Sequence, residues 1–102
     1  MIHIVAILTA ADRQREALLT EFKKNLTTVR LERGCVRYDA VIDIEGGPAT
    51  LARIGPDAFM VIEQWESRDA VEAHAASAHM AGYAERVKEL LLSRVVYGLC
   101  SI

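Results

Sequence analysis

The alternation of apolar and polar positions along the chain predicts its strands and helices in turn. Residues 2–8 form a short apolar run rich in β-branched side chains, which is typical of a buried strand. Residues 12–33 carry apolar side chains at helical spacing, with most charged residues lying off that stripe. Gly34 follows, where a glycine commonly ends a helix. We therefore predict a strand and then a long helix, whose inward stripe consists of Leu18, Phe22, Leu26 and Val29.

The next two segments both have the pattern of strands. Residues 35–43 alternate, and residues 59–65 are apolar at most positions, as in a strand that is covered on both faces. Between them, residues 45–57 contain both prolines and three of the six glycines, which predicts a long loop. Such a loop is either a lid or binding edge over a site, or a plain extension of the hairpin. One face of the first of these strands is expected to hold Val36, Tyr38, Ala40 and Ile42.

The C-terminal part of the chain is predicted to contain a broken helix and a last strand. Ser67 can cap a helix over residues 67–77, which breaks near Ser77 and resumes over 78–92. Residues 95–102 form the final strand. The order β-α-β-β-α-β, with the broken helix counted once, is typical of a ferredoxin-like α+β sandwich. In that fold both helices pack on one face of an antiparallel sheet.

The predicted strands carry more apolar surface than this fold can bury by itself. Segments 2–8, 59–65 and 95–100 are apolar at nearly every position, yet the chain has no spare helix to cover the outer sheet face. Hydrophobic residues also make up 52% of the chain, a share that favours association in a short protein. We therefore predict a homodimer in which two sheets pack face to face and enclose a dimeric α/β barrel.

Length and charge narrow the classes of function. A chain of 102 residues has the usual size of one domain, which we place over 1–102. Twelve basic and fourteen acidic residues give a net charge of −2, which indicates no nucleic acid and no anionic membrane as a partner. The N-terminus lacks the pattern of a signal peptide and no apolar run could span a bilayer, so we expect a cytoplasmic protein. Cys35 and Cys100 are too few for a disulfide framework or a zinc site and are expected to be buried.

Two histidines are the first candidates for chemistry. His74 lies beside alanines on the inward stripe of its helix, so we predict a base or proton shuttle facing a pocket. The alternative is a core histidine, satisfied by a backbone carbonyl or bonded to Glu63. His79 either begins the next helical segment or shares the role of base. On a continuous helix the two would diverge, unless the break near Ser77 turns them toward each other. No Cys or carboxylate completes a ligand set, so we expect no metal ion and no cofactor.

Five further side chains belong to the candidate site. Trp65 ends the third strand, where it forms either a pocket wall with its N–H as a donor or a plug in the core. Tyr38 and Tyr83 lie on inward stripes, and their phenols either donate to a substrate oxygen or bridge the dimer contact. Glu63 is a carboxylate within an apolar strand, which requires a partner such as a histidine or an arginine. Phe59 is expected in the core, at the wall of the substrate site.

Two segments of the chain form a recognisable combination. Residues 32–38 read E-x-G-C-x-x-Y, and residues 63–80 read E-x-W-x-S, then A-H, then S-x-H. In order and spacing these motifs resemble the antibiotic biosynthesis monooxygenase (ABM) domain family, and the resemblance covers essentially the whole chain. It implies a dimeric α/β barrel with a pocket for a small aromatic or polar carbonyl compound. It also implies a cofactor-independent monooxygenase, which oxidises a phenolic, quinol or anthrone-like substrate with O2.

Oxygenation of this kind requires a base, a donor to a developing oxyanion and an apolar cavity. We assign catalytic roles to His74, Trp65 and Tyr38, and substrate binding to Glu63, His79, Tyr83 and Phe59. Two other functions stay open: an isomerase or lyase that acts on a small carbonyl compound, and a non-catalytic dimer that binds a small molecule. Haem degradation is not expected, because the first strand lacks the asparagine of the haem-degrading relatives.

Overall fold

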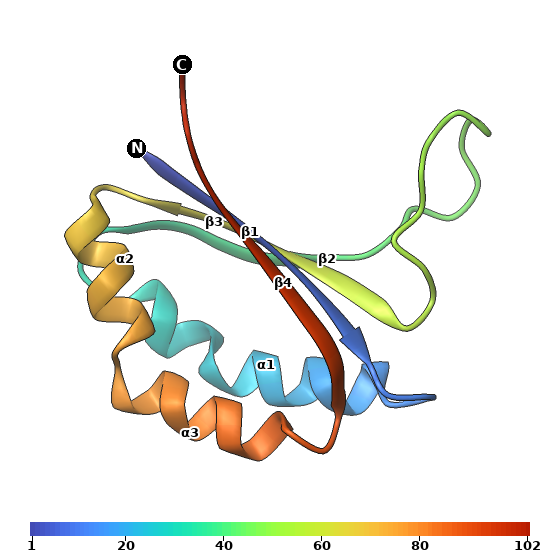
Figure 1. Cartoon of the computed structure of the whole chain (residues 1–102), viewed down its shortest axis with the longest axis horizontal. Helices are drawn as coiled ribbons and strands as arrows, with labels where there is room; N and C mark the ends of the chain where they lie inside the picture. The colour runs from blue at the N-terminus through green and yellow to red at the C-terminus, as the bar shows by residue number, and fades with distance from the viewer.

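The computed structural model describes all residues from 1 to 102 and contains an antiparallel sheet with three helices on one face (Figure 1). The sheet has four strands in the order β2-β3-β1-β4, and each neighbouring pair is antiparallel. This arrangement confirms the predicted ferredoxin-like α+β fold. The elements are β1 (Ile2–Ala10), α1 (Arg15–Arg30), β2 (Cys35–Val41), β3 (Ala58–Trp65), α2 (Arg68–Ala75), α3 (Ala78–Val87) and β4 (Leu91–Cys100).

The core lies between the sheet and the helices. Alternate residues of β1 and β3 face the helix layer, because successive side chains of a strand point to opposite faces. They meet the predicted stripe of α1, in which Leu18, Phe22 and Val29 are buried while Leu26 is only partly so. The buried positions of the two central strands include Ala6, Leu8, Phe59, Val61 and Trp65.

The first helix is shorter at both ends than the predicted 12–33. Arg13 has φ = +61°, a left-handed conformation that cannot continue into a helix, so α1 begins at Arg15. At the other end Leu31 caps the helix and a turn follows. Gly34 belongs to this turn, with φ = +84°, and a Cβ there would lie 2.6 Å from the Cβ of Ala70. The glycine is therefore required both by the backbone and by the close approach of α2.

Strand β2 corrects the predicted alternation. Its pairing with β3 shifts register between Cys35 and Arg37, and this irregularity turns Val36 outward, where it is 49% exposed. Ile42 lies beyond the end of the strand and is also exposed. Only Tyr38 and Ala40 of the predicted face point toward the helices.

The broken helix is explained by two serine caps. The side chain of Ser67 accepts a hydrogen bond from the backbone N–H of Ala70, and that of Ser77 accepts one from Met80. Each bond satisfies a free N–H at a helix start, so α2 and α3 form as two helices that meet near Ser77, as predicted. Helix α3 ends earlier than expected. A turn closed by the bond from Leu90 N–H to Val87 C=O leads into β4, which already begins at Leu91.

The long loop between β2 and β3 projects from one end of the sheet, away from the helices (Figure 1, green). It is held by its own polar contacts, since the Asp43 carboxylate accepts hydrogen bonds from the backbone N–H groups of Ile54 and Gly55. Arg53 also donates to two carbonyls of the loop. The loop is therefore an ordered extension of the hairpin and does not cover the helix side of the sheet.

The outer face of the sheet is bare of helices. Residues of β4 on this face, Val95, Tyr97 and Leu99, are 47%, 50% and 49% exposed. Cys100 at the end of the strand is exposed as well, contrary to the expectation of a buried thiol, while Cys35 is half-buried. None of the helices combines the length and the apolar character that a membrane crossing requires.

Candidate active site

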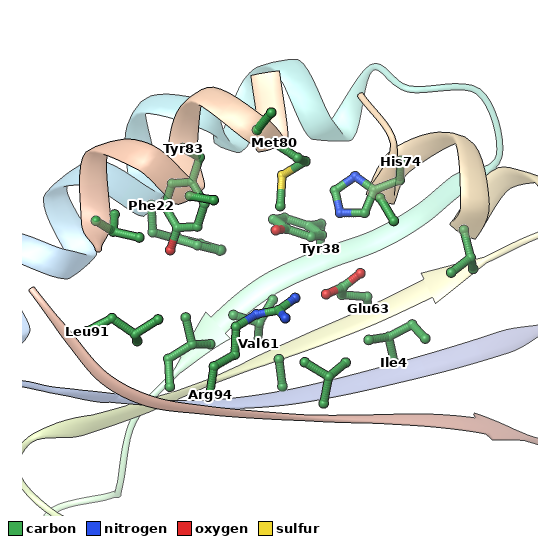
Figure 2. A pocket seen from close by; sticks show the side chains of 18 residues that line it. Ile4, Phe22, Tyr38, Val61, Glu63, His74, Met80, Tyr83, Leu91 and Arg94 are labelled. Carbon is green, nitrogen blue, oxygen red and sulfur yellow. The ribbon is translucent and has the colours of Figure 1, made fainter. Parts of the chain in front are cut away.

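A cavity of about 450 Å³ lies between the sheet and the helices α2 and α3 (Figure 2). Its volume falls within the range of small-molecule sites. Fifteen of its eighteen lining residues are hydrophobic. The three others, Glu63, His74 and Arg94, come from three different elements and turn toward the same space. An apolar cavity with a few convergent polar groups is the usual form of a site that binds and orients a small organic molecule.

His74 lies in the last turn of α2 and is buried. Its ring packs on the ring of Trp65, with the ring centroids 4.7 Å apart. It also lies edge-on to the ring of Tyr38, with the centroids 5.6 Å apart. Its Nδ1 lies 2.8 Å from Oε2 of Glu32, which stands in the turn after α1. Because an ionised carboxylate only accepts hydrogen bonds, Nδ1 carries the hydrogen and donates it. When the ring is neutral, its Nε2 therefore carries no hydrogen and is available to the cavity that the ring lines.

Glu63 places a carboxyl group in the floor of the cavity, on β3. It is 7% exposed, and Nε1–H of Trp65 donates a hydrogen bond of 2.9 Å to its Oε1. Burial raises the pKa of Glu63, and the hydrogen bond from Trp65 and the proximity of His74 and Arg94 offset this only in part. Glu63 therefore has a stronger tendency to hold a proton than an exposed glutamate.

Trp65 and Phe59 lie in the core, which was one of the two expected places for Trp65 and the expected place for Phe59, and not at the wall of the cavity. Both side chains are fully buried and neither lines the cavity. The N–H of Trp65 is bonded to Glu63 and is not free to reach a substrate. Trp65 thus lies beneath the site and supports its floor, and Phe59 packs in the core against Phe22.

Two tyrosines supply hydroxyl groups to the cavity. Tyr38 stacks on Phe22 with centroids 5.4 Å apart, and both Tyr38 and Tyr83 are buried and line the cavity. Burial raises the pKa of both phenols, that of Tyr83 to about 12. The hydroxyl of Tyr83 has no hydrogen-bond partner. Both groups therefore remain protonated at neutral pH and can donate to an oxygen atom of a ligand.

Arg94 is a site residue that the sequence pattern missed. It pairs with Leu8 in the sheet, and its side chain turns from β4 into the cavity (Figure 2). It makes no hydrogen bond or ion pair within the chain, and its charge favours the ionised forms of Glu63, Tyr38 and Tyr83. The predicted strand began only at residue 95, whereas β4 begins at Leu91 and contains Arg94.

His79 lies outside the cavity, and both His79 and His74 contact the carboxylate of Glu32. Nε2 of His79 contacts Oε1 of Glu32, while His74 contacts the other oxygen of the same carboxylate. The expectation that no carboxylate accompanies the two histidines was wrong, and the break near Ser77 prevents the divergence expected of a continuous helix. The break between α2 and α3 turns His79 back, and Glu32 arrives from a segment 42 residues before His74.

Comparisons with known proteins show which family and fold the chain is similar to. Residues 1–86 match the sequence pattern described as antibiotic biosynthesis monooxygenase, a stretch that includes every site residue named above except Arg94. The probable quinol monooxygenase YgiN of Escherichia coli is 40% identical over 74 residues, which are 72% of this chain and 70% of YgiN.

Solved structures extend the likeness over nearly the whole chain. PA3566 from Pseudomonas aeruginosa is 27% identical with a TM-score of 0.82, covering 99% of this chain and 93% of its own. Rv0793 from Mycobacterium tuberculosis is 25% identical with a TM-score of 0.81, covering 99% and 94%. By its sequence pattern, its close relative and its fold, the chain belongs to the antibiotic biosynthesis monooxygenase family.

Proposed function

We propose that this protein is a cofactor-independent monooxygenase that oxidises a small quinol, phenol or anthrone-like substrate with O2. The observation that carries the proposal is the position of His74, whose ring lines an apolar cavity while its Nδ1 is bonded to Glu32. Family membership supports the reaction class. A relative named as a probable quinol monooxygenase supports a quinol as the substrate.

The chemistry needs no external reductant, because the substrate supplies all the electrons. His74 takes a proton from the substrate, and the resulting anion passes one electron to O2. The radical pair recombines at carbon, and the O–O bond then breaks. In an anthrone, for example, the methylene carbon loses two C–H bonds and gains one C=O bond. The second oxygen atom leaves as water with both hydrogens, so O2 is fully reduced and the substrate gives up four electrons.

The base and the two hydroxyl donors of the cavity each have a place in this scheme. Glu32 holds Nδ1–H, which fixes the tautomer in which Nε2 accepts the proton. The hydroxyls of Tyr38 and Tyr83 donate to the oxygen on which negative charge develops. The apolar lining excludes water and so strengthens these contacts. Trp65 acts through Glu63, whose carboxyl it holds in the floor of the cavity.

We also propose that the active form is a homodimer. The outer sheet face is covered by no helix, and its exposed side chains on β4 are Val95, Tyr97 and Leu99. A contiguous apolar face of this kind is rarely left in water. Packing against the same face of a second copy would bury these residues in an isologous contact.

The test is oxygen uptake with a panel of quinols and anthrones. Wild type is compared with His74→Gln, with the matched variant Glu72→Gln on the exposed side of the same helix, and with a reaction without protein. We expect His74→Gln to lose about a hundredfold or more of the rate, the usual contribution of a positioned base. Glu72→Gln should keep it. Equal uptake in all four reactions would overturn the proposal, and turnover without O2 would indicate an isomerase or lyase instead.

A further inference from the structure

We propose that Glu32, His74 and His79 form a binding site for one divalent transition-metal ion of the zinc, cobalt or nickel type. One carboxylate oxygen and two imidazole nitrogens, all within 4.8 Å of one another, converge on the same point. Two histidines and one carboxylate are a donor set that proteins use for these ions, with a further position left to water.

The three ligands are held by well-ordered parts of the fold. Glu32 stands in the turn between α1 and β2, two residues before Gly34, whose carbonyl accepts a hydrogen bond of 2.8 Å from the N–H of Glu66. The carbonyl of His74 accepts a bond from the hydroxyl of Ser77, and that of His79 accepts one from the side chain of Asn25. These contacts fix the backbone at both histidines and so limit the cost of assembling the site.

The ligand pair formed by His74 and Glu32 requires only a small adjustment. Nδ1 of His74 and Oε2 of Glu32 are 2.8 Å apart. Metal–ligand bonds of about 2.0–2.1 Å in a tetrahedral site place donor atoms roughly 3.3 Å apart, so this pair must separate by about half an ångström. The side chain of His79 is 27% exposed, against 8% for His74, and offers the entry path from solvent.

The ion would lie behind the wall of the cavity. Glu32 and His79 do not line the cavity, and His74 would bind through Nδ1, the nitrogen that points away from it toward Glu32. Metal bound at Nδ1 leaves the hydrogen on Nε2, so His74 could no longer accept a proton from a substrate. A bound ion would therefore inhibit the monooxygenase. This consequence rests on the proposed function, whereas the binding itself does not.

Fluorescence of the chain's one tryptophan gives a direct test of binding. Trp65 lies 4.7 Å from the ring of His74, so Co²⁺ at this site should quench its emission. Metal-free protein is titrated with Co²⁺ and then with Zn²⁺, and calorimetry gives the stoichiometry. We expect saturable quenching at one ion per chain, tetrahedral Co²⁺ absorption bands, and displacement by Zn²⁺.

Three variants assign the ligands. Glu32→Gln and His79→Asn should each weaken binding by at least about tenfold. The matched control His3→Gln removes a histidine at the start of β1, bonded to Ser101, and should bind as wild type does. Circular dichroism checks each fold, and if Glu32→Gln is unfolded the more exposed His79→Asn decides alone. The proposal is overturned if wild type shows no saturable quenching, or if both site variants, when folded, bind as tightly as His3→Gln.

Discussion

The buried carboxyl of Glu63 should make the stability of this protein fall as the pH rises. Burial raises its pKa above the ordinary 4.5, which the unfolded chain keeps. Between these two values the folded protein holds one proton more than the unfolded chain. The free energy of unfolding therefore falls with pH across this window, by up to about 1.4 kcal/mol per pH unit. Below pH 4.5 the carboxyl of Glu63 is protonated in both the folded and the unfolded state, and its contribution to the free energy of unfolding no longer changes with pH.

Replacement of Glu63 by glutamine isolates this effect. The amide has nearly the same shape, and its oxygen can still accept the hydrogen bond from Trp65. Because groups distant from Glu63 titrate alike in both proteins, the difference in unfolding free energy between Glu63→Gln and wild type reports Glu63 together with the neighbours that interact with its charge. We expect the variant to gain stability relative to wild type as the pH rises above 4.5, with a plateau once the folded carboxyl has ionised.

Urea unfolding, followed by the fluorescence of Trp65 at fixed protein concentration, measures this difference at each pH. The matched control is Glu66→Gln, which removes an exposed carboxylate just beyond the end of the same strand. The difference in unfolding free energy between Glu66→Gln and wild type should not increase with pH as it does for Glu63→Gln. A difference between Glu63→Gln and wild type that stays constant from acid to neutral pH would refute the reasoning that burial controls the protonation of this group.

Three further substitutions test the fold and the assembly. Gly34→Ala should lower the free energy of unfolding by more than about 1 kcal/mol, because alanine is strained at φ = +84° and its Cβ would meet Ala70; a loss too small to measure by urea unfolding would contradict this. Trp65→Phe removes the donor to the buried carboxyl of Glu63 and should cost about 1–3 kcal/mol in the same assay, whereas a near-neutral result would mean that the bond contributes little. Tyr97→Glu puts a charge on the outer sheet face and should turn a dimer into a monomer by light scattering; a monomeric wild type, or a variant that stays dimeric, would count against the proposed interface.

Much of the fold could be predicted because burial on one face leaves a local pattern. The stripe of α1 and the apolar run of β3 are read from spacing alone, and both were correct. The inward face of β2 was only half correct, since Val36 is turned outward by a register shift against β3. That shift depends on the pairing of two strands far apart in the sequence, which spacing within one strand does not contain.

The candidate site divides in the same way. His74 and Tyr38 face the cavity because each lies on an inward stripe, which the sequence shows directly. The meeting of His79 with Glu32 depends on the angle between two helices and on a distant turn. The side chain of Arg94 points into the cavity because the register between β4 and β1 places Arg94 opposite Leu8. Neither the contact of His79 with Glu32 nor the position of Arg94 in the cavity can be predicted from the local sequence around these residues.

The fate of the two oxygen atoms of O2 tests the central claim most directly. The protein is incubated with a quinol or anthrone that supports oxygen uptake, under isotopically labelled O2, and the product is analysed at once by mass spectrometry. The proposed reaction predicts one labelled oxygen atom in each product molecule, at a rate that collapses in His74→Gln. A product without label, with hydrogen peroxide formed in its place, would show simple oxidation of the substrate and contradict the monooxygenase assignment.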